Sequence, residues 1–249
     1  MNALPKPYYK DDFVTIYHGD CREIVPHLGK FDLLLTDPPY GMGFQSNRRS
    51  IKHDRIYGDE ALPVEFLTQA ISLAHRAAYI FCRWENIQEL PKPKSVLAWV
   101  KNNWSMGDLK HEHGRQWEAC CFYANSGHEF LRRIPDVVFA DRTGNELHPT
   151  QKPESLLSQI IAANVGDTIL DPFAGSGTTG RAAKDLGRKC TLIEREERYC
   201  EIAAKRMRQE VLLPFASVAP LKERELFGTL AEPLAHLDKH ATRANIPST

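Results

Sequence analysis

The sequence lacks an excess of charge of either sign, a long apolar run and a closely spaced cysteine pair. Its 32 Lys and Arg residues balance 32 Asp and Glu residues, so any surface that attracts nucleic acid must be local. No apolar run approaches the roughly 18 residues of a membrane span, and the first residues contain no signal-peptide core. Hydrophobic residues make up 42% of the 249 positions, which excludes a wholly disordered chain. These features predict a soluble, cytoplasmic protein without a membrane partner.

Cysteine is spread along the chain without a Cys-x-x-Cys pair, which favours reduced thiols. The six cysteines are Cys21, Cys82, Cys120, Cys121, Cys190 and Cys200. One cluster, formed by His111, His113, Cys120 and Cys121, has the side chains that zinc prefers. However, neighbouring cysteines on a strand point to opposite faces, so we expect no metal site there.

Apolar runs that end in turn residues alternate with segments of helical period, which is typical of an α/β protein with a mostly parallel sheet. Strands are expected over 13–17, 32–36, 78–82, 96–100, 119–123, 168–170 and 190–193. Helices are expected over 63–76, 153–163 and 181–186. Two polar stretches, 41–57 and 102–117, are expected to be loops, and the segment 214–249 is expected to be a peripheral tail.

A glycine-rich segment, Asp171-Pro172-Phe173-Ala174-Gly175-Ser176-Gly177-Thr178-Thr179-Gly180, lies between an expected strand and an expected helix. Its G-x-G-x-x-G string is a weak signal by itself. Glu194 stands 19 residues beyond Gly175, where such folds hold a ribose by its hydroxyls. A dinucleotide and S-adenosylmethionine both contain a ribose, so this loop does not choose between them. The ammonium of a methionine moiety would need a further acid, which Asp171 could supply.

The turn Asp37-Pro38-Pro39-Tyr40 follows the expected strand 32–36, at the edge where open α/β sheets bind ligands. An exocyclic amino group of a base is a poor nucleophile, because its lone pair is delocalised into the ring. The Asp37 carboxylate and the Pro38 carbonyl can accept its hydrogen bonds and stabilise the positive charge that develops on nitrogen. Tyr40 offers a face for stacking, and the base must leave the duplex to reach it.

These motifs resemble the DNA amino-methyltransferases, which use S-adenosylmethionine to methylate adenine N6 or cytosine N4. The resemblance covers residues 14–207 and includes His148-Pro149-Thr150-Gln151-Lys152-Pro153 between the two motifs above. The catalytic turn precedes the cofactor loop, as in the circularly permuted β class. The resemblance therefore implies a Rossmann-like methyltransferase fold with helices on both faces of the sheet, in a catalytic domain of residues 1–213.

The resemblance assigns roles to matched positions. Catalysis falls to Asp37, Pro38, Pro39 and Tyr40. S-adenosylmethionine would be bound by Asp20, Cys21, Asp37, Thr150, Lys152, Asp171, Phe173, Gly175, Gly177, Thr178 and Glu194. Within this set, Asp20 would contact the adenine, Glu194 the ribose hydroxyls, and Thr150 and Lys152 the methionine end. Asp at the first position of the turn favours adenine N6, with cytosine N4 as the alternative.

The resemblance implies DNA as the partner, read through small recognition loops in 41–57 and 102–117. Their cations could neutralise phosphates, although charged loops are also common on ordinary surfaces. These cations are Arg48, Arg49, Lys52, Arg55, Lys110 and Arg115. A homodimer and a cognate restriction endonuclease are further candidate partners, because such associations occur among relatives.

Two other functions compete with methyl transfer. A nicotinamide-dependent oxidoreductase would use the glycine loop and Glu194, but it leaves Asp37–Tyr40 without a role and predicts NAD binding. A DNA-binding module that has lost activity predicts that Asp37→Ala changes nothing measurable.

Overall fold

The computed structural model describes residues 4–41, 61–104, 110–111, 113–143, 147–148 and 150–210. All of its strands and helices belong to a unit formed by residues 1–214, and the second unit, 215–249, lies outside the described residues. The predicted recognition cations Arg48, Arg49, Lys52 and Arg55 also lie outside them.

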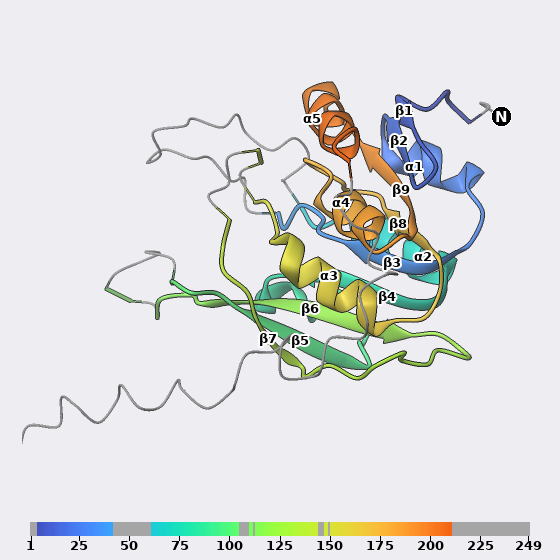
Figure 1. Cartoon of the computed structure of the whole chain (residues 1–249). Coiled ribbons are helices and arrows are strands. Elements are labelled where there is room, and N and C mark those ends of the chain that lie inside the picture. Colours follow the sequence, from blue (N-terminus) through green and yellow to red (C-terminus); the bar gives the residue numbers. More distant parts are fainter. Residues whose placement is uncertain are drawn as a thin grey trace, which may run out of the picture. The chain divides into compact units, whose positions relative to one another are not determined.

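One mixed sheet of nine strands runs through the described residues, in the order β1-β2-β9-β8-β3-β4-β6-β5-β7 (Figure 1). The strands are β1 (Tyr9–Lys10), β2 (Val14–His18), β3 (Phe31–Thr36), β4 (Ala74–Cys82), β5 (Ser95–Val100), β6 (Trp117–Ala124), β7 (Val137–Phe139), β8 (Thr168–Asp171) and β9 (Lys189–Glu194). Strands β2, β9, β8, β3 and β4 are parallel neighbours. β6 is antiparallel to both β4 and β5, and β1 is antiparallel to β2.

Helices cover both faces of this sheet (Figure 1). They are α1 (Cys21–Ile24), α2 (Val64–Leu73), α3 (Glu154–Ala163), α4 (Thr178–Asp185) and α5 (Glu197–Met207), with 3-10 turns η1 (Val25–His27) and η2 (Trp84–Asn86). One hydrophobic core joins α3, α4 and α5 to the sheet, and a second core joins α1 and α2 to the opposite face. This three-layer arrangement confirms the predicted Rossmann-like fold. None of the described helices is long and apolar enough to cross a membrane.

Most expected elements differ from the observed ones by only one or two residues at each end, but α2 and β4, which was expected over 78–82, are exceptions. The expected helix 63–76 ends at Leu73, and Ala74 already begins β4. The Ile71 carbonyl accepts a hydrogen bond from the backbone N–H of Ala74, and the side chain of Asn125 donates further hydrogen bonds to the carbonyls of Ile71 and Ala74 at this helix end. Beyond that point the backbone pairs with β3 and β6, so tertiary pairing overrides the helical pattern.

Helix α4 also differs, since it begins at Thr178 rather than at residue 181. Strands β1 and β7 and helices α1 and α5 were not predicted from the sequence. Cys120 packs in one hydrophobic core and Cys121 in the other, which confirms that the two side chains point to opposite faces of the sheet. All six cysteines are free, buried thiols.

The strand order brings distant motifs together. β2, β9, β8 and β3 are consecutive parallel neighbours, so their carboxyl ends meet at one edge of the sheet. Asp20 follows β2, Glu194 ends β9, the glycine loop follows β8, and Asp37 follows β3. Thus the catalytic turn and the cofactor loop are neighbours in space, although the turn comes first in the chain.

Candidate active site

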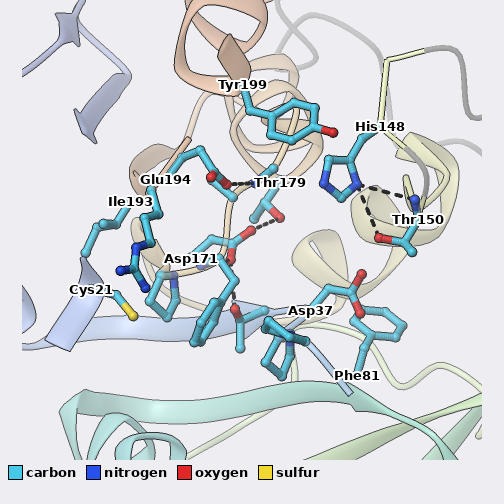
Figure 2. Close-up of a pocket in the computed structure, with 18 of the residues that line it drawn as sticks. Cys21, Asp37, Phe81, His148, Thr150, Asp171, Thr179, Ile193, Glu194 and Tyr199 are labelled. Carbon is cyan, nitrogen blue, oxygen red and sulfur yellow. Dashed lines mark hydrogen bonds between the residues drawn. The ribbon is translucent and has the colours of Figure 1, made fainter. Parts of the chain in front are cut away.

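A cavity of about 600 Å³ opens at this edge of the sheet. Its walls come from the four strand ends, from residues 61–66 and from the segment around Thr150. Figure 2 shows Glu194 and Ile193 on one side of the cavity, His148 and Thr150 on the other, and Asp171 between them. Asp37 and Phe81 lie below His148 and Thr150 in the same view. The cavity has the size of a small-molecule site and contains residues of each predicted motif.

Glu194 is held in a fixed orientation at the end of β9. The backbone N–H of Gly175 donates to its Oε2 at 2.8 Å, and the N–H of Glu196 donates to its Oε1 at 2.7 Å. Burial raises the pKa of Glu194, an effect that these hydrogen bonds oppose. Each carboxylate oxygen keeps a second lone pair, so Glu194 can still accept hydrogen bonds from a pair of ligand hydroxyls.

Gly177 closes the glycine loop and caps α4 with a left-handed backbone, at φ 79°. A Cβ atom there would lie 2.7 Å from the Cβ of Ala203 on α5, which is closer than two carbon atoms can pack. Gly187 has a similar φ of 68° but has open space around it. A substitution at Gly187 therefore measures the free-energy cost of the backbone conformation without a steric clash.

We expect Gly187→Ala to lower the free energy of unfolding by about 1–2 kcal/mol through backbone strain alone. Gly177→Ala should cost about 1–3 kcal/mol more, because α5 must move away from α4. Urea denaturation of both variants measures the difference. Equal losses would show that the contact with Ala203 does not constrain the loop.

Asp171 lies in the cavity wall, but its oxygens already have partners. Oδ1 accepts from the Thr36 hydroxyl at 2.8 Å and from the Phe173 N–H at 3.1 Å, and Oδ2 accepts from the Thr179 hydroxyl at 2.6 Å. Burial raises the pKa of Asp171 to about 6. These contacts tie the end of β3 to the glycine loop. Binding of a ligand ammonium by Asp171 stays a prediction.

Asp20 caps the N-terminus of α1 at the other end of the cavity. It accepts from the backbone N–H of Arg22 at 2.9 Å and pairs with the guanidinium of the same residue at 2.6 Å. This partner lowers the pKa of Asp20, so the side chain stays ionised. Cys21 and Phe173 line the same region, and the Phe173 ring packs edge-on against Phe66. The predicted contact of Asp20 with adenine stays a prediction.

Asp37 stands between a phenol and an ammonium. The Tyr40 hydroxyl donates to its Oδ1 at 2.5 Å, and the Lys152 Nζ donates to its Oδ2 at 2.5 Å. Burial raises the pKa of Asp37, an effect that Lys152 opposes. One lone pair on each carboxylate oxygen remains for a substrate. Lys152, predicted to bind the methionine end, therefore contacts the catalytic turn directly, and Tyr40, predicted as a stacking platform, also orients Asp37.

Two charged residues of this site were missed by sequence reasoning. Glu118 on β6 accepts from Lys152 at 3.3 Å and from Lys101, just after β5, at 2.5 Å. Burial would raise the pKa of Glu118, but the two lysines lower it to about 2. A charged residue beside the apolar run 119–123 was the available signal, because burying a carboxylate requires a partner.

The segment between the two motifs connects them physically. The His148 ring packs against Tyr199 with centroids 4.5 Å apart, and its Nδ1 lies 3.2 Å from the Thr150 hydroxyl (Figure 2). His148 also covers the glycine loop, because a Cβ on Gly175 would lie 3.3 Å from its ring. Two residues after Thr150, Lys152 reaches Asp37. Pro149 lies outside the described residues.

Arg206 of α5 supports the glycine loop from behind and was also missed by sequence reasoning. Its guanidinium donates to the carbonyl of Ser176 at 2.7 Å and pairs with Glu154 of α3. The glycine loop is therefore supported by a buried cation as well as by backbone contacts.

Of the predicted DNA contacts, Lys110 and Arg115 are described, and Arg115 pairs with Glu85 at 2.9 Å. Their contact with phosphates stays a prediction.

Comparison with known proteins identifies the family. A family model described as DNA methylase, for N6 and N4 methyltransferases, matches residues 97–205. The type II methyltransferase M2.LlaDCHI of Lactococcus lactis subsp. cremoris is 56% identical over an alignment of 259 residues, which covers 82% of this chain and 93% of that protein. The chain belongs to the N6/N4 DNA methyltransferases. The match therefore confirms the predicted resemblance, and it favours methyl transfer over nicotinamide-dependent oxidation.

Other members of this S-adenosylmethionine-dependent family extend the comparison. The type II methyltransferase M.HinfI of Haemophilus influenzae is 51% identical over 71 residues, but this match spans only 20% of that protein and 28% of the chain. The crystal structure of M1.HpyAVI in complex with S-adenosylmethionine is 26% identical, with a TM-score of 0.61 over 78% of the chain and 100% of that protein. The PvuII cytosine-N4-specific DNA methyltransferase, at 15% identity, has a TM-score of 0.62 over 90% of the chain and 94% of that protein. That last likeness concerns the fold.

Proposed function

We propose that this DNA methyltransferase transfers a methyl group from S-adenosylmethionine to the exocyclic N6 of adenine in DNA, by direct transfer after the base is extruded. The observation that carries the proposal is the hydrogen bond between Thr36 and Asp171. Because these residues adjoin the catalytic turn and the glycine loop, this contact holds Asp37 next to the cofactor residues. A substrate amino group on Asp37 would then face a ligand bound by the loop.

The residues of the cavity fit the proposed cofactor. Glu194 has two free acceptor positions for the ribose hydroxyls, and the Phe173 ring and Ile193 supply an apolar wall. Asp20, kept ionised by Arg22, stands at the adenine end. When bound, S-adenosylmethionine supplies an electrophilic methyl group on a sulfonium. No cysteine is required as a nucleophile, because the transfer is direct.

The catalytic turn is organised before a substrate arrives. Tyr40 and Lys152 fix both oxygens of Asp37, so little reorganisation is needed when the carboxylate accepts from the target amino group. Pro38 and Pro39 carry no backbone N–H, which leaves the carbonyl of Pro38 as a second acceptor without a competing donor. Two acceptors on one amino group align its lone pair with the methyl group and stabilise the charge formed on nitrogen.

The same acceptors would serve the N4 amino group of cytosine, which is the alternative substrate. Asp at the first position of the turn supports adenine, because family members with this residue mostly act on adenine N6. The fold likeness to the PvuII enzyme does not bear on the base, since only the fold is shared at 15% identity.

One assay separates the two bases. The protein is incubated with labelled S-adenosylmethionine and unmodified DNA, and the product is digested to nucleosides and weighed. We expect the label in N6-methyldeoxyadenosine. Label in N4-methyldeoxycytidine would show that cytosine N4 is the methylated position instead. A folded protein that binds S-adenosylmethionine but labels neither base would overturn the proposed activity.

The contacts with the DNA backbone and the further partners stay predictions. Among the described cations, Lys110 and Arg115 follow β5 and precede β6, in the connection at the edge of the sheet where β4 ends. A homodimer and a cognate endonuclease likewise rest on the family resemblance, and a cytoplasmic location rests on the sequence features given above.

A further inference from the structure

Four charged side chains form an unbroken row beneath the catalytic turn. Asp37 pairs with Lys152 at 2.5 Å, Lys152 with Glu118 at 3.3 Å, and Glu118 with Lys101 at 2.5 Å. The signs alternate, and the four charges sum to zero. Tyr40 links the two carboxylates, because its hydroxyl lies 2.5 Å from Asp37 and 3.5 Å from Glu118. Of these four residues, only Asp37 and Lys152 belong to predicted motifs.

Lys152 is the centre of this row and is cut off from water. Its side chain is 6% exposed. The rings of Phe81, Tyr40 and Trp99 lie 5.2, 5.5 and 5.9 Å from its Nζ, which places an ammonium among aromatic faces. In such a dry site an ammonium stays charged only with close anionic partners. Burial would lower the pKa of Lys152, but Asp37 and Glu118 raise it above its usual value.

Glu118 and Lys101 are positioned by strands β6 and β5 and not by the catalytic turn. Glu118 lies in β6, paired with Trp99 of β5, and Lys101 follows directly after β5. A misplacement of about 1 Å in a catalytic group can cost a hundredfold in rate, so a rigid anchor for Lys152 has kinetic consequences. Neither residue is a catalytic residue, because another side chain separates each from Asp37.

We propose that Glu118 and Lys101 are positioning residues, which hold Lys152 against Asp37 and so set how well that carboxylate accepts the target amino group. This inference rests on the proposed function, since it concerns the same reaction. It adds two residues from β5 and β6 to a site that the motifs place on β3, β8 and β9.

The charges of the row predict opposite effects on the pKa of Asp37 when Glu118 or Lys101 is replaced. Glu118 repels the ionised form of Asp37 and so contributes to its raised pKa. Removing Glu118 should therefore lower the pKa of Asp37. Removing Lys101 leaves Glu118 with one cation fewer, which should raise the pKa of Asp37. The double replacement removes one charge of each sign, but Glu118 is the nearer of the two, so the pKa of Asp37 should be lowered less than by removing Glu118 alone.

Other titratable groups near the row remain in place in every variant. Cys82 and Asp171 are close enough to interact with Asp37, Cys120 interacts with Lys152, and Arg142 interacts with Lys101. Any acid limb that these groups contribute to the pH profile is common to all variants. A difference in midpoint between variants therefore comes from the charges of the row.

The test compares Glu118→Gln, Lys101→Met and the double variant. Single-turnover methyl transfer is measured at saturating DNA and S-adenosylmethionine over the whole pH range in which the protein stays folded, because an essential carboxylate gives an acid limb. We expect the limb to move to lower pH in Glu118→Gln and to higher pH in Lys101→Met. The double variant should have a midpoint between those of Glu118→Gln and the natural protein. Each single variant should lose about 10- to 100-fold in rate and keep its affinity for the cofactor.

Glu201→Gln, an exposed glutamate on α5, serves as the matched control and should change neither rate nor midpoint. Coincident midpoints in the two single variants, or a shift in the reverse order, would overturn the inference. If one single variant does not fold, the direction in which the acid limb moves in the other variant still tests the inference. A natural protein that transfers no methyl group would refute the proposed function instead, so the two failures are distinguishable.

Discussion

Asp37→Asn should reduce the single-turnover rate of methyl transfer by about 10³-fold or more, which is the scale for losing an oriented group that stabilises developing charge. The amide is nearly the same size as the carboxylate but carries no negative charge. It also presents an N–H₂ group, which opposes the donor on the base. Binding of S-adenosylmethionine should change little, because the Glu194 and glycine-loop contacts are intact.

Asp185→Asn provides the matched control, since Asp185 is a half-exposed partner of Arg181 on α4. It should retain the natural rate. Cofactor affinity is measured for both variants by calorimetry, and thermal melting checks that they are folded. An Asp37→Asn enzyme with more than a tenth of the natural rate would contradict the assigned role of the carboxylate.

Lys152→Met should lower the free energy of unfolding by about 3–5 kcal/mol at neutral pH, as expected when one partner of a buried ion pair is removed. Asp37 and Glu118 would then face each other without the cation between them. By comparison, Lys205→Met removes an exposed charge on α5 and should cost less than about 0.5 kcal/mol.

The loss in Lys152→Met should depend on pH in a definite direction. Without the ammonium, repulsion raises the pKa of at least one of the two carboxyls in the folded protein above its value in the unfolded chain. The folded state is then favoured while that group is protonated, and this advantage disappears as the pH rises through the raised pKa. The deficit should therefore be smaller at pH 5 than at pH 7, by an amount that urea denaturation at the two pH values measures.

Adding Glu118→Gln to Lys152→Met should recover part of the lost stability at neutral pH, because the remaining carboxylate no longer faces another charge. A deficit of equal size at both pH values, unchanged by the second replacement, would mean that packing rather than charge explains the loss.

Several parts of the site could be predicted from local sequence. The apolar runs that became β3, β8 and β9 end directly before Asp37, at the glycine loop and at Glu194. Because carboxyl ends of parallel strands share one edge of a sheet, the motifs had to converge. The glycine loop could be recognised because Gly177 occupies a backbone conformation that other residues avoid.

Sequence reasoning could not find the partners of these motifs. Glu118 reaches Lys152 only because β6 inserts between β4 and β5 in the antiparallel direction. Strand insertion of this kind depends on pairing between segments far apart in the chain, for which no local pattern exists. The end of α2 at Leu73 has the same origin, because Asn125 donates a hydrogen bond to the last turn of the helix and the backbone from Ala74 onward pairs with β3.

Short motifs and the period of apolar side chains were enough to indicate the family and the fold class, and they nominated the residues that we propose face the cofactor and the base. The surroundings of Asp37, in contrast, follow from contacts between distant parts of the chain. A buried carboxylate needs a counter-charge, which Lys152 supplies to Asp37, and the sheet places Glu118 and Lys101 where they complete the row of charges beside Lys152.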